Sequence, residues 1–305
     1  MLSRAKASLV LMRTRTQADW VLLVAVLIAA AVMAGAVCVE RRIGPAAGGW
    51  VTALPISFAV TLVVVSLTAG GGATAQIALS AAEHVPAQVI FAVMFAAVLE
   101  RYGLLAGVIT GSLGYVAVSA CLMWLPGAVC ISLGILALAL TPPLFPIRDG
   151  VVKRPRHWSA MVLTCAAGSV VVLAAVLSTR VAGPVIGGAV AAFPTLSGTL
   201  TAAVTVGAGR RAGAAVLLGL VRSLPCYLAF CLVVALTARS TGVASIALAA
   251  LVAIAAATAN WRLVTNGRRH TRLPTTADSA QAARSISPAP APALSAAAVS
   301  TARRA

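Results

Sequence analysis

The chain has 305 residues, of which 61% are apolar and 10% are charged, and its mean hydropathy is +1.01. Soluble domains carry about a quarter charged residues, so these values exclude an ordinary water-soluble globular fold and indicate a membrane protein. The net charge of +17 does not indicate nucleic-acid binding. Nearly all Lys and Arg residues lie at the ends of apolar runs or in the two tails, where membrane proteins place them.

The apolar runs predict the fold class. They are continuous, about 20 residues long and without period-two alternation, which favours helices over a transmembrane barrel. We therefore expect an all-α, polytopic transmembrane bundle with about nine spans. In chain order the predicted spans are Trp20–Val39, Gly48–Thr68, Thr74–Leu99, Gly103–Trp124, Ala128–Leu140, Ser159–Leu177, Gly183–Val206, Ala212–Ala238 and Gly242–Trp261.

Polar segments divide the chain into five parts. All five Trp residues fall at or near predicted span ends, as in interfacial aromatic belts. The last segment is rich in Ala, Pro and Ser, and we expect it to be disordered. The parts are a basic N-terminal segment (1–18), a first membrane repeat (19–142), a central basic loop (143–158), a second membrane repeat (159–262) and a tail (263–305).

A twelve-residue motif occurs twice in the chain. GPAAGGWVTALP at 44–55 and GPVIGGAVAAFP at 183–194 share seven of twelve positions, at an offset of 139 residues. The same offset pairs prolines 86 and 225, glycines 103 and 242, and Glu83 with Arg222. A match sustained at one fixed offset indicates an internal duplication.

The number of crossings predicts how the two repeats are oriented. Five crossings separate the first span from the sixth, so the repeats should be inverted, as in many secondary transporters. If the short fifth span, which ends at Pro142-Pro143, only re-enters the membrane, the repeats are parallel instead. Most Lys and Arg residues of the predicted loops lie on the C-terminal side, which places the C-terminal tail in the cytoplasm. The basic N-terminal segment argues for the opposite orientation.

Glu83 and Arg222 carry the strongest functional signal. Each lies about 13–15 Å into its span, near the middle of a hydrocarbon core of about 30 Å. A charge at that depth costs about 2.5–3.5 kcal/mol, so an intramembrane charge indicates function. We expect the two residues to form an ion pair or to line one wet cavity. The alternative is a static pair that fixes how the two halves dock.

Other polar residues extend this predicted solute or ion pathway. His84 adjoins Glu83 and has a side chain suited to a proton relay, although a lone His in an apolar helix is also often simply hydrogen-bonded. Gln76, Gln88 and Tyr227 are further candidate pathway residues.

Glycine and proline residues form a predicted helix-break or gate motif. Proline removes a helical hydrogen bond, and broken helices at matching positions in two halves are typical of transporter sites. The alternative is that the glycines only permit tight packing. The motif comprises Gly48, Gly49, Pro55 and Pro86 in the first half, and Gly187, Gly188, Pro194 and Pro225 in the second.

Enzyme and metal-site patterns are missing from the sequence. HExxH, GxSxG and Walker A motifs do not occur, and the chain has only six acidic residues. The six cysteines show no CxxC spacing. We therefore expect neither an enzyme nor a bound cofactor or metal.

The segment Gly187–Phe230, GGAVAAFPTLSGTLTAAVTVGAGRRAGAAVLLGLVRSLPCYLAF, resembles small GlpM-like bacterial inner-membrane proteins. The resemblance covers about 45 residues strongly, and the first half only loosely. It implies a fused pair of such units in the bacterial plasma membrane, reminiscent of drug/metabolite-type inverted-repeat transporters. It transfers no catalytic residue.

These patterns predict a secondary transporter or exporter of a small solute, embedded in the lipid bilayer and coupled to protons through Glu83. The alternative is a non-transporting scaffold or accessory factor in envelope polysaccharide or lipid assembly. A water-filled cavity that reaches Glu83 would favour the transporter, and a dry, closed axis would favour the scaffold.

Overall fold

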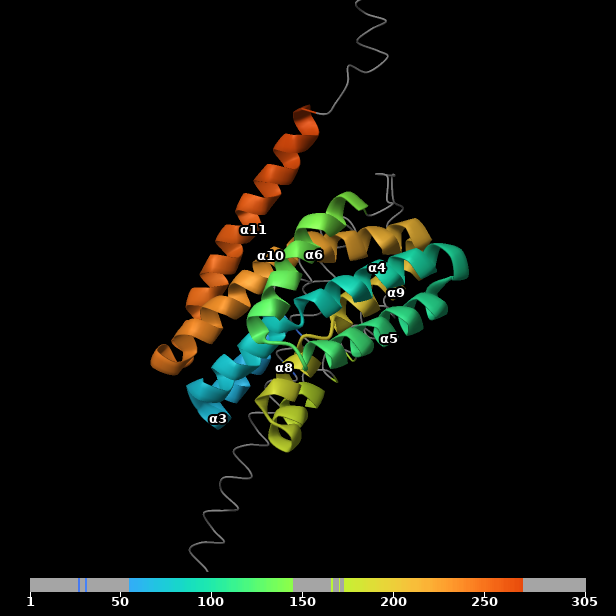
Figure 1. The fold of residues 1–305 in the computed structure, drawn as a ribbon. Coiled ribbons are helices and arrows are strands. Elements are labelled where there is room, and N and C mark those ends of the chain that lie inside the picture. The colour runs from blue at the N-terminus through green and yellow to red at the C-terminus, as the bar shows by residue number, and fades with distance from the viewer. Residues whose placement is uncertain are drawn as a thin grey trace, which may run out of the picture. The chain divides into compact units, whose positions relative to one another are not determined.

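The structure, a computed structural model, describes residues 55–144 and 173–270, together with the isolated positions 27, 31, 166 and 170. All regular structure in this part of the chain is helical (Figure 1). The labelled helices are α3 (Ile56–Glu83), α4 (Val85–Tyr102), α5 (Leu104–Leu122), α6 (Gly127–Leu144), α8 (Pro184–Ala191), α9 (Thr195–Ala208), α10 (Arg210–Thr241) and α11 (Ala244–His270).

The chain divides by its internal contacts into two units, Met1–Asn260 and Trp261–Ala305. Within the second unit, the described residues are helical up to His270. The predicted first span except positions 27 and 31, residues 44–54 of the motif, residues 145–158 of the central loop and residues 271–305 of the tail lie outside the described residues.

Five helices in the described residues are long and apolar enough to cross a membrane. This agrees with the predicted multi-pass membrane protein, although the described residues do not reach the nine spans predicted. The five are Phe58–Glu83, Val85–Tyr102, Leu104–Leu122, Pro184–Ala208 and Arg210–Thr241, and the shorter apolar helices are Gly127–Thr141, Leu173–Ala182 and Ala244–Ala259.

Single glycines with positive φ separate successive helices. Gly70 interrupts α3 with φ +82° and ψ 175°, and Gly209 separates α9 from α10 with φ +93° and ψ 169°. Gly103 and Gly242, with φ +92° and +55°, do the same before α5 and α11. This backbone region favours glycine. Gly70 and Gly209, like Gly103 and Gly242, stand 139 residues apart, so helix ends recur at the offset that relates the sequence motifs.

Two long helical segments lie between these glycines, and we call them the first arm and the second arm. The first arm, residues 71–102, consists of the second part of α3 and all of α4, and it is kinked at His84. The helical bonds from His84 N to Ser80 O and from Gln88 N to His84 O, each 3.2 Å, continue across the kink. Pro86, in the first turn of α4, lacks the N–H that would close the ladder there. The second arm is α10, and it passes through Pro225 as one continuous helix.

The two arms run antiparallel. At one end, Gly71 packs so closely on the second arm that a Cβ atom there would overlap the Ala238 carbonyl. At the other end, Arg210 Nη1 donates a hydrogen bond of 3.0 Å to the Glu100 carbonyl. Each arm therefore begins where the other ends.

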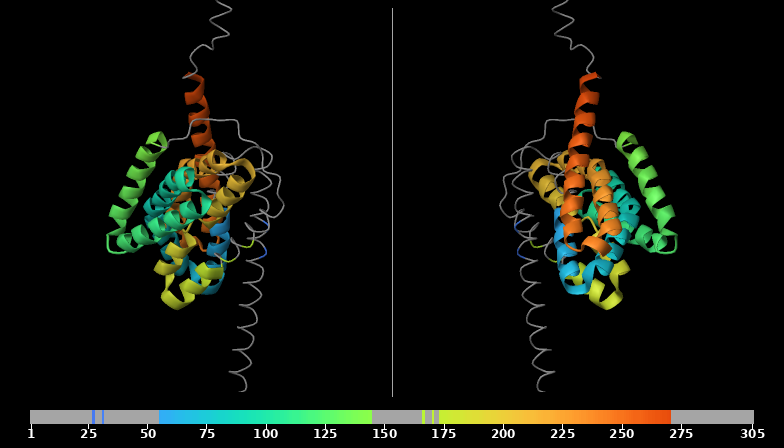
Figure 2. Two further views of the ribbon diagram at one scale, coloured as in Figure 1. Left: turned by 90° about the vertical axis from the view of Figure 1, so that its right-hand side faces the viewer. Right: turned by 90° about the vertical axis from the view of Figure 1, so that its left-hand side faces the viewer.

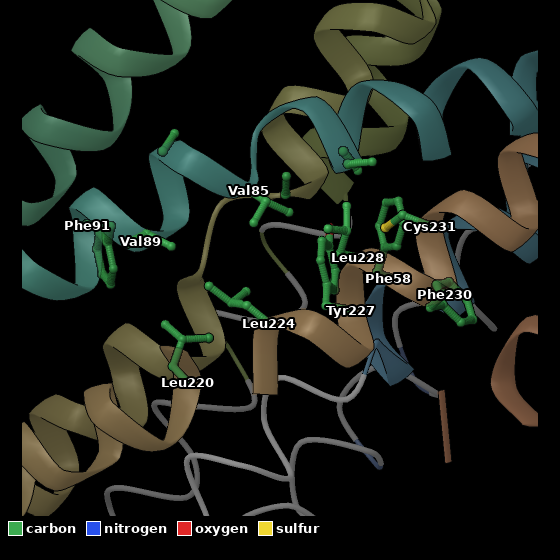
Figure 3. Packing of buried hydrophobic residues seen from close by; sticks show 14 of the residues in the cluster. Phe58, Val85, Val89, Phe91, Leu220, Leu224, Tyr227, Leu228, Phe230 and Cys231 are labelled. Atoms are coloured by element: carbon green, nitrogen blue, oxygen red, sulfur yellow. The ribbon is translucent and has the colours of Figure 1, made fainter. Parts of the chain in front are cut away.

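A single large hydrophobic cluster fills the space between the arms and the helices around them. It includes Val85 and Leu224, which occupy equivalent positions of the two arms, and the aromatic residues Phe58 and Phe230 (Figure 3). Glycines allow close approach at its edge, because a Cβ atom on Gly107 of α5 would lie 2.6 Å from the Phe95 ring of α4. Gly107, Gly111 and Gly114 of α5 are buried at this contact.

The helix α6 lies against the kink of the first arm. Gly127 touches the Glu83 carboxyl group, and a Cβ atom on Gly134 would lie 3.5 Å from both Val85 and Pro86. Figure 2 shows α6 beside α4 in both views. The helix continues through Pro142-Pro143 to Leu144, past the predicted end of the fifth span at Leu140.

Candidate functional site

Buried polar side chains recur every four residues on each arm, and we call this set the polar seam. Gln88 of the first arm lies beside Tyr227 of the second, and Cys231 lies beside Tyr227. The seam contains three side chains from each arm, and all six are buried. They are Ser80, His84 and Gln88 on the first arm and Ser223, Tyr227 and Cys231 on the second.

Helical geometry and the repeat offset both place these residues. On each arm the three positions are four residues apart, so they share one face of the helix. His84 and Ser223 are equivalent at the 139-residue offset, as are Gln88 and Tyr227. Gln88 and Tyr227 are also direct neighbours. Equivalent positions of antiparallel elements meet only near the axis that relates them, so the seam lies at the centre of the paired arms.

His84 presents an unpaired nitrogen at the seam. Its Nδ1 lies 2.7 Å from the Ser80 carbonyl oxygen. Because a carbonyl can only accept, Nδ1 carries a proton. The ring is 2% exposed, and Nε2 has no hydrogen-bond partner in the described part of the chain. His84 is thus oriented by Ser80 and presents Nε2 inside the protein.

Tyr227 presents a second unpaired polar atom. Its polar neighbours are the Gln88 amide and the Cys231 thiol. Both lie close to the hydroxyl group, but within the described residues it makes no hydrogen bond of regular geometry. The ring packs on Phe58 at a centroid distance of 5.6 Å (Figure 3). By contrast, Ser223 satisfies its hydroxyl on the Gly219 and Leu220 carbonyls of its own helix.

The remaining predicted pathway residues lie apart from the seam. Glu83 is half-buried, and its neighbours are Gly127, His84 and Cys130. Arg222 is half-buried on α10 and is not among the groups that act on Glu83. The ion pair between them therefore stays a prediction. Gln76 is exposed.

A broken helix crosses the first arm close to the seam. The helix α8 ends at Ala191, and α9 begins after Pro194, which has a non-helical ψ of 54°. Pro55 precedes α3 with a similar ψ of 38°. The interruption between α8 and α9 therefore lies at residues 192–194 of the second copy, and Pro55 stands at the equivalent position of the first. Gly48 and Gly49 lie outside the described residues.

Two glycines bring α8 against its neighbours. A Cβ atom on Gly188 would lie 2.6 Å from the Ser80 Cβ and 2.7 Å from the Ile77 carbonyl, and one on Gly187 would overlap Thr179. The Ser80 hydroxyl donates to the Val185 carbonyl at 2.7 Å. Ser80 thus connects the polar seam to the broken helix.

Tyr115 of α5 anchors the broken end of α8. Its hydroxyl donates to the Ala189 carbonyl at 2.6 Å. Phe193, within the break, packs edge-on against Tyr115 at 5.0 Å and against Phe91 at 5.8 Å. An aromatic cluster therefore surrounds the interruption.

Four contributors to this site are not predicted from the sequence: Ser80, Tyr115, Ser223 and Cys231. Single hydroxyl and thiol side chains are common in apolar helices and give no individual signal. The signal that could have found them is spacing. Each seam residue that was not predicted lies four residues from His84 or Tyr227, on the same face of the helix.

The donor groups do not form a metal site. Within residues 55–144 and 173–270 no three His, Cys, Asp or Glu side chains gather to hold an ion, and Cys121, Cys130, Cys226 and Cys231 are free thiols.

Comparison of the chain with protein-family models, with curated proteins and with solved structures finds no match.

Proposed function

We propose that this protein is a secondary transporter or exporter of a small, hydrogen-bonding solute, and that its binding site is the polar seam. One observation carries the proposal: among the described residues, two buried polar atoms of the polar seam, His84 Nε2 and the Tyr227 hydroxyl, have no hydrogen-bond partner of regular geometry. Leaving such a group unpaired costs about 1–3 kcal/mol. A solute that forms hydrogen bonds with His84 Nε2, Tyr227 and Gln88 would recover that cost.

The antiparallel arms support the inverted-repeat part of the proposal. Arms that occupy equivalent positions of the repeat and cross a bilayer in opposite directions are related by an axis in the membrane plane. Binding at such an axis, beside discontinuous helices, is the arrangement of many inverted-repeat transporters. The break at Pro194 and the matching backbone at Pro55 provide the discontinuity. The GlpM-like resemblance of Gly187–Phe230 belongs to the same proposal.

Glu83 has a secondary role in this proposal, as the proton-coupling group. It is half-buried next to His84 at the kink, where Pro86 interrupts the helical ladder. Movement at the kink would change the surroundings of both side chains together. Arg222, one residue before Ser223, would respond in the same way on the second arm.

A non-transporting scaffold is the second candidate. It is favoured by the close packing of the seam, in which His84 is 2% exposed and Cys231 0%. A scaffold keeps this interior dry, whereas a transporter opens it to water in turn from each face.

The native Cys231 distinguishes the two candidates. Full-length variants that retain only Cys231, or only the exposed Cys121 as a control, would be reconstituted in liposomes. They would then be treated with a membrane-impermeant methanethiosulfonate reagent added outside or trapped inside. We expect Cys231 to react slowly from both faces, because transport requires each open state. Fast reaction at Cys121 with none at Cys231 from either face would support the scaffold and reject transport.

A further inference from the structure

The end of the first arm and the start of the second form a basic corner. Arg210 reaches across to the Glu100 carbonyl at 3.0 Å, and its guanidinium group packs beside Gly103. Arg101 follows Glu100 in the chain, and Arg211 follows Arg210. The fold therefore places the ends of two segments that are more than 100 residues apart next to each other, and three arginines lie on those ends.

These arginines are exposed and not neutralised. Arg101, Arg210 and Arg211 all face outward. Glu100 is the acidic residue beside them, and no ion pair joins it to any of the three within the described part of the chain. Arg210 donates its hydrogen bond to the neutral Glu100 carbonyl and not to a carboxylate, so the bond does not neutralise its positive charge.

The corner lies at the level where apolar helices reach the membrane surface. The spans Val85–Tyr102 and Arg210–Thr241 end and begin there. Lipid phosphates occupy that level, and arginine binds phosphate through paired N–H donors. At the opposite end of the arms, Arg239 is the basic side chain among the described residues. The corner therefore carries three arginines and Glu100, whereas the opposite end of the arms carries Arg239.

We propose that Arg101, Arg210 and Arg211 form a binding site for the headgroup of an anionic phospholipid. Arg210, held by Glu100, provides a fixed guanidinium group, and Arg101 and Arg211 close on the headgroup phosphate from the two arms. The site joins the end of one arm to the start of the other through a lipid. It does not depend on solute transport through the polar seam.

Native mass spectrometry of the detergent-solubilised full chain tests this site. Phosphatidylglycerol would be titrated onto the natural protein, onto the triple variant R101Q/R210Q/R211Q and onto the control Arg239→Gln. Each basic residue near an anionic surface contributes about fivefold in affinity, so we expect the triple variant to bind on the order of a hundredfold more weakly. The control should keep its affinity, and phosphatidylcholine should bind weakly to all three proteins.

Two results would overturn the proposal. One is equal phosphatidylglycerol affinity in the natural protein and the triple variant. The other is displacement of the lipid by millimolar inorganic phosphate, which would identify a free-anion site. If the triple variant does not fold, the single variant Arg211→Gln, at an exposed position, takes its place. We expect it to lose about fivefold in phosphatidylglycerol affinity.

Discussion

At the residue scale, the buried polar side chains differ in whether a hydrogen bond satisfies them. Ser80, Ser223 and Tyr115 all bond to backbone carbonyls, whereas within the described residues His84 and Tyr227 each keep one buried atom unpaired. Satisfied hydroxyl groups stabilise helix contacts, and unpaired ones reduce stability. The proposed solute site uses the two residues whose polar atoms lack a protein partner.

Tyr115 provides a stability prediction at this scale. Replacing Tyr115 by Phe keeps the edge-on contact with Phe193 but removes the hydrogen bond to the Ala189 carbonyl. We expect a loss of about 1–3 kcal/mol in unfolding free energy, measured by denaturation in mixed micelles. Tyr102→Phe, at a side chain that is 74% exposed, is the control and should be neutral. Equal effects of the two changes would show that the Tyr115 hydroxyl does not anchor α8.

At the element scale, glycine determines how closely the helices approach. Gly188 places α8 against Ile77 and Ser80 of the first arm, and Gly107 places α5 against Phe95. Small residues permit such approach in membrane bundles, where packing replaces the hydrophobic effect between helices. The broken helix and the polar seam are in contact because Gly188 has no side chain.

Gly188→Ala tests this contact. The added methyl group would lie 2.6 Å from the Ser80 Cβ, so α8 has to move. Overpacking of this kind costs about 1–3 kcal/mol in unfolding free energy. Gly72→Ala, where no atom lies within 4 Å of the added carbon, should be neutral or stabilising by about 0.5–1 kcal/mol. The same micelle denaturation applies, and a neutral Gly188→Ala would contradict the tight crossing.

Periodicity and repeated motifs predicted part of this organisation. Glycines 103 and 242 were identified at matching positions and do terminate helices, and the kink at Glu83–Pro86 follows from a proline that lacks an N–H group. The equivalent Pro225 lies within α10, which stays continuous. Residue spacing alone did not show that the kink directs Glu83 toward α6, since that depends on tertiary packing.

At the scale of the whole molecule, the antiparallel arms predict that the two arms cross the membrane in opposite directions. The end of the first arm and the end of the second arm should face different compartments. Tyr102→Cys and Ser240→Cys, both at exposed positions, report these ends when placed singly in a cysteine-free chain. In sealed, oriented vesicles an impermeant thiol reagent added outside should label one position and leave the other protected. Labelling of both positions from the same side would reject an inverted crossing.

The length of the arms has a consequence for the membrane itself. The second arm has 32 residues, and at 1.5 Å per residue it measures about 48 Å, against a hydrocarbon core of about 30 Å. A helix longer than the local thickness tilts, or the bilayer adjusts around it. The second arm is continuous through Pro225 and has to tilt as a rigid rod, whereas the first arm can bend at His84. Bilayer thickness therefore acts directly on the angle between the arms, and so on the seam between them.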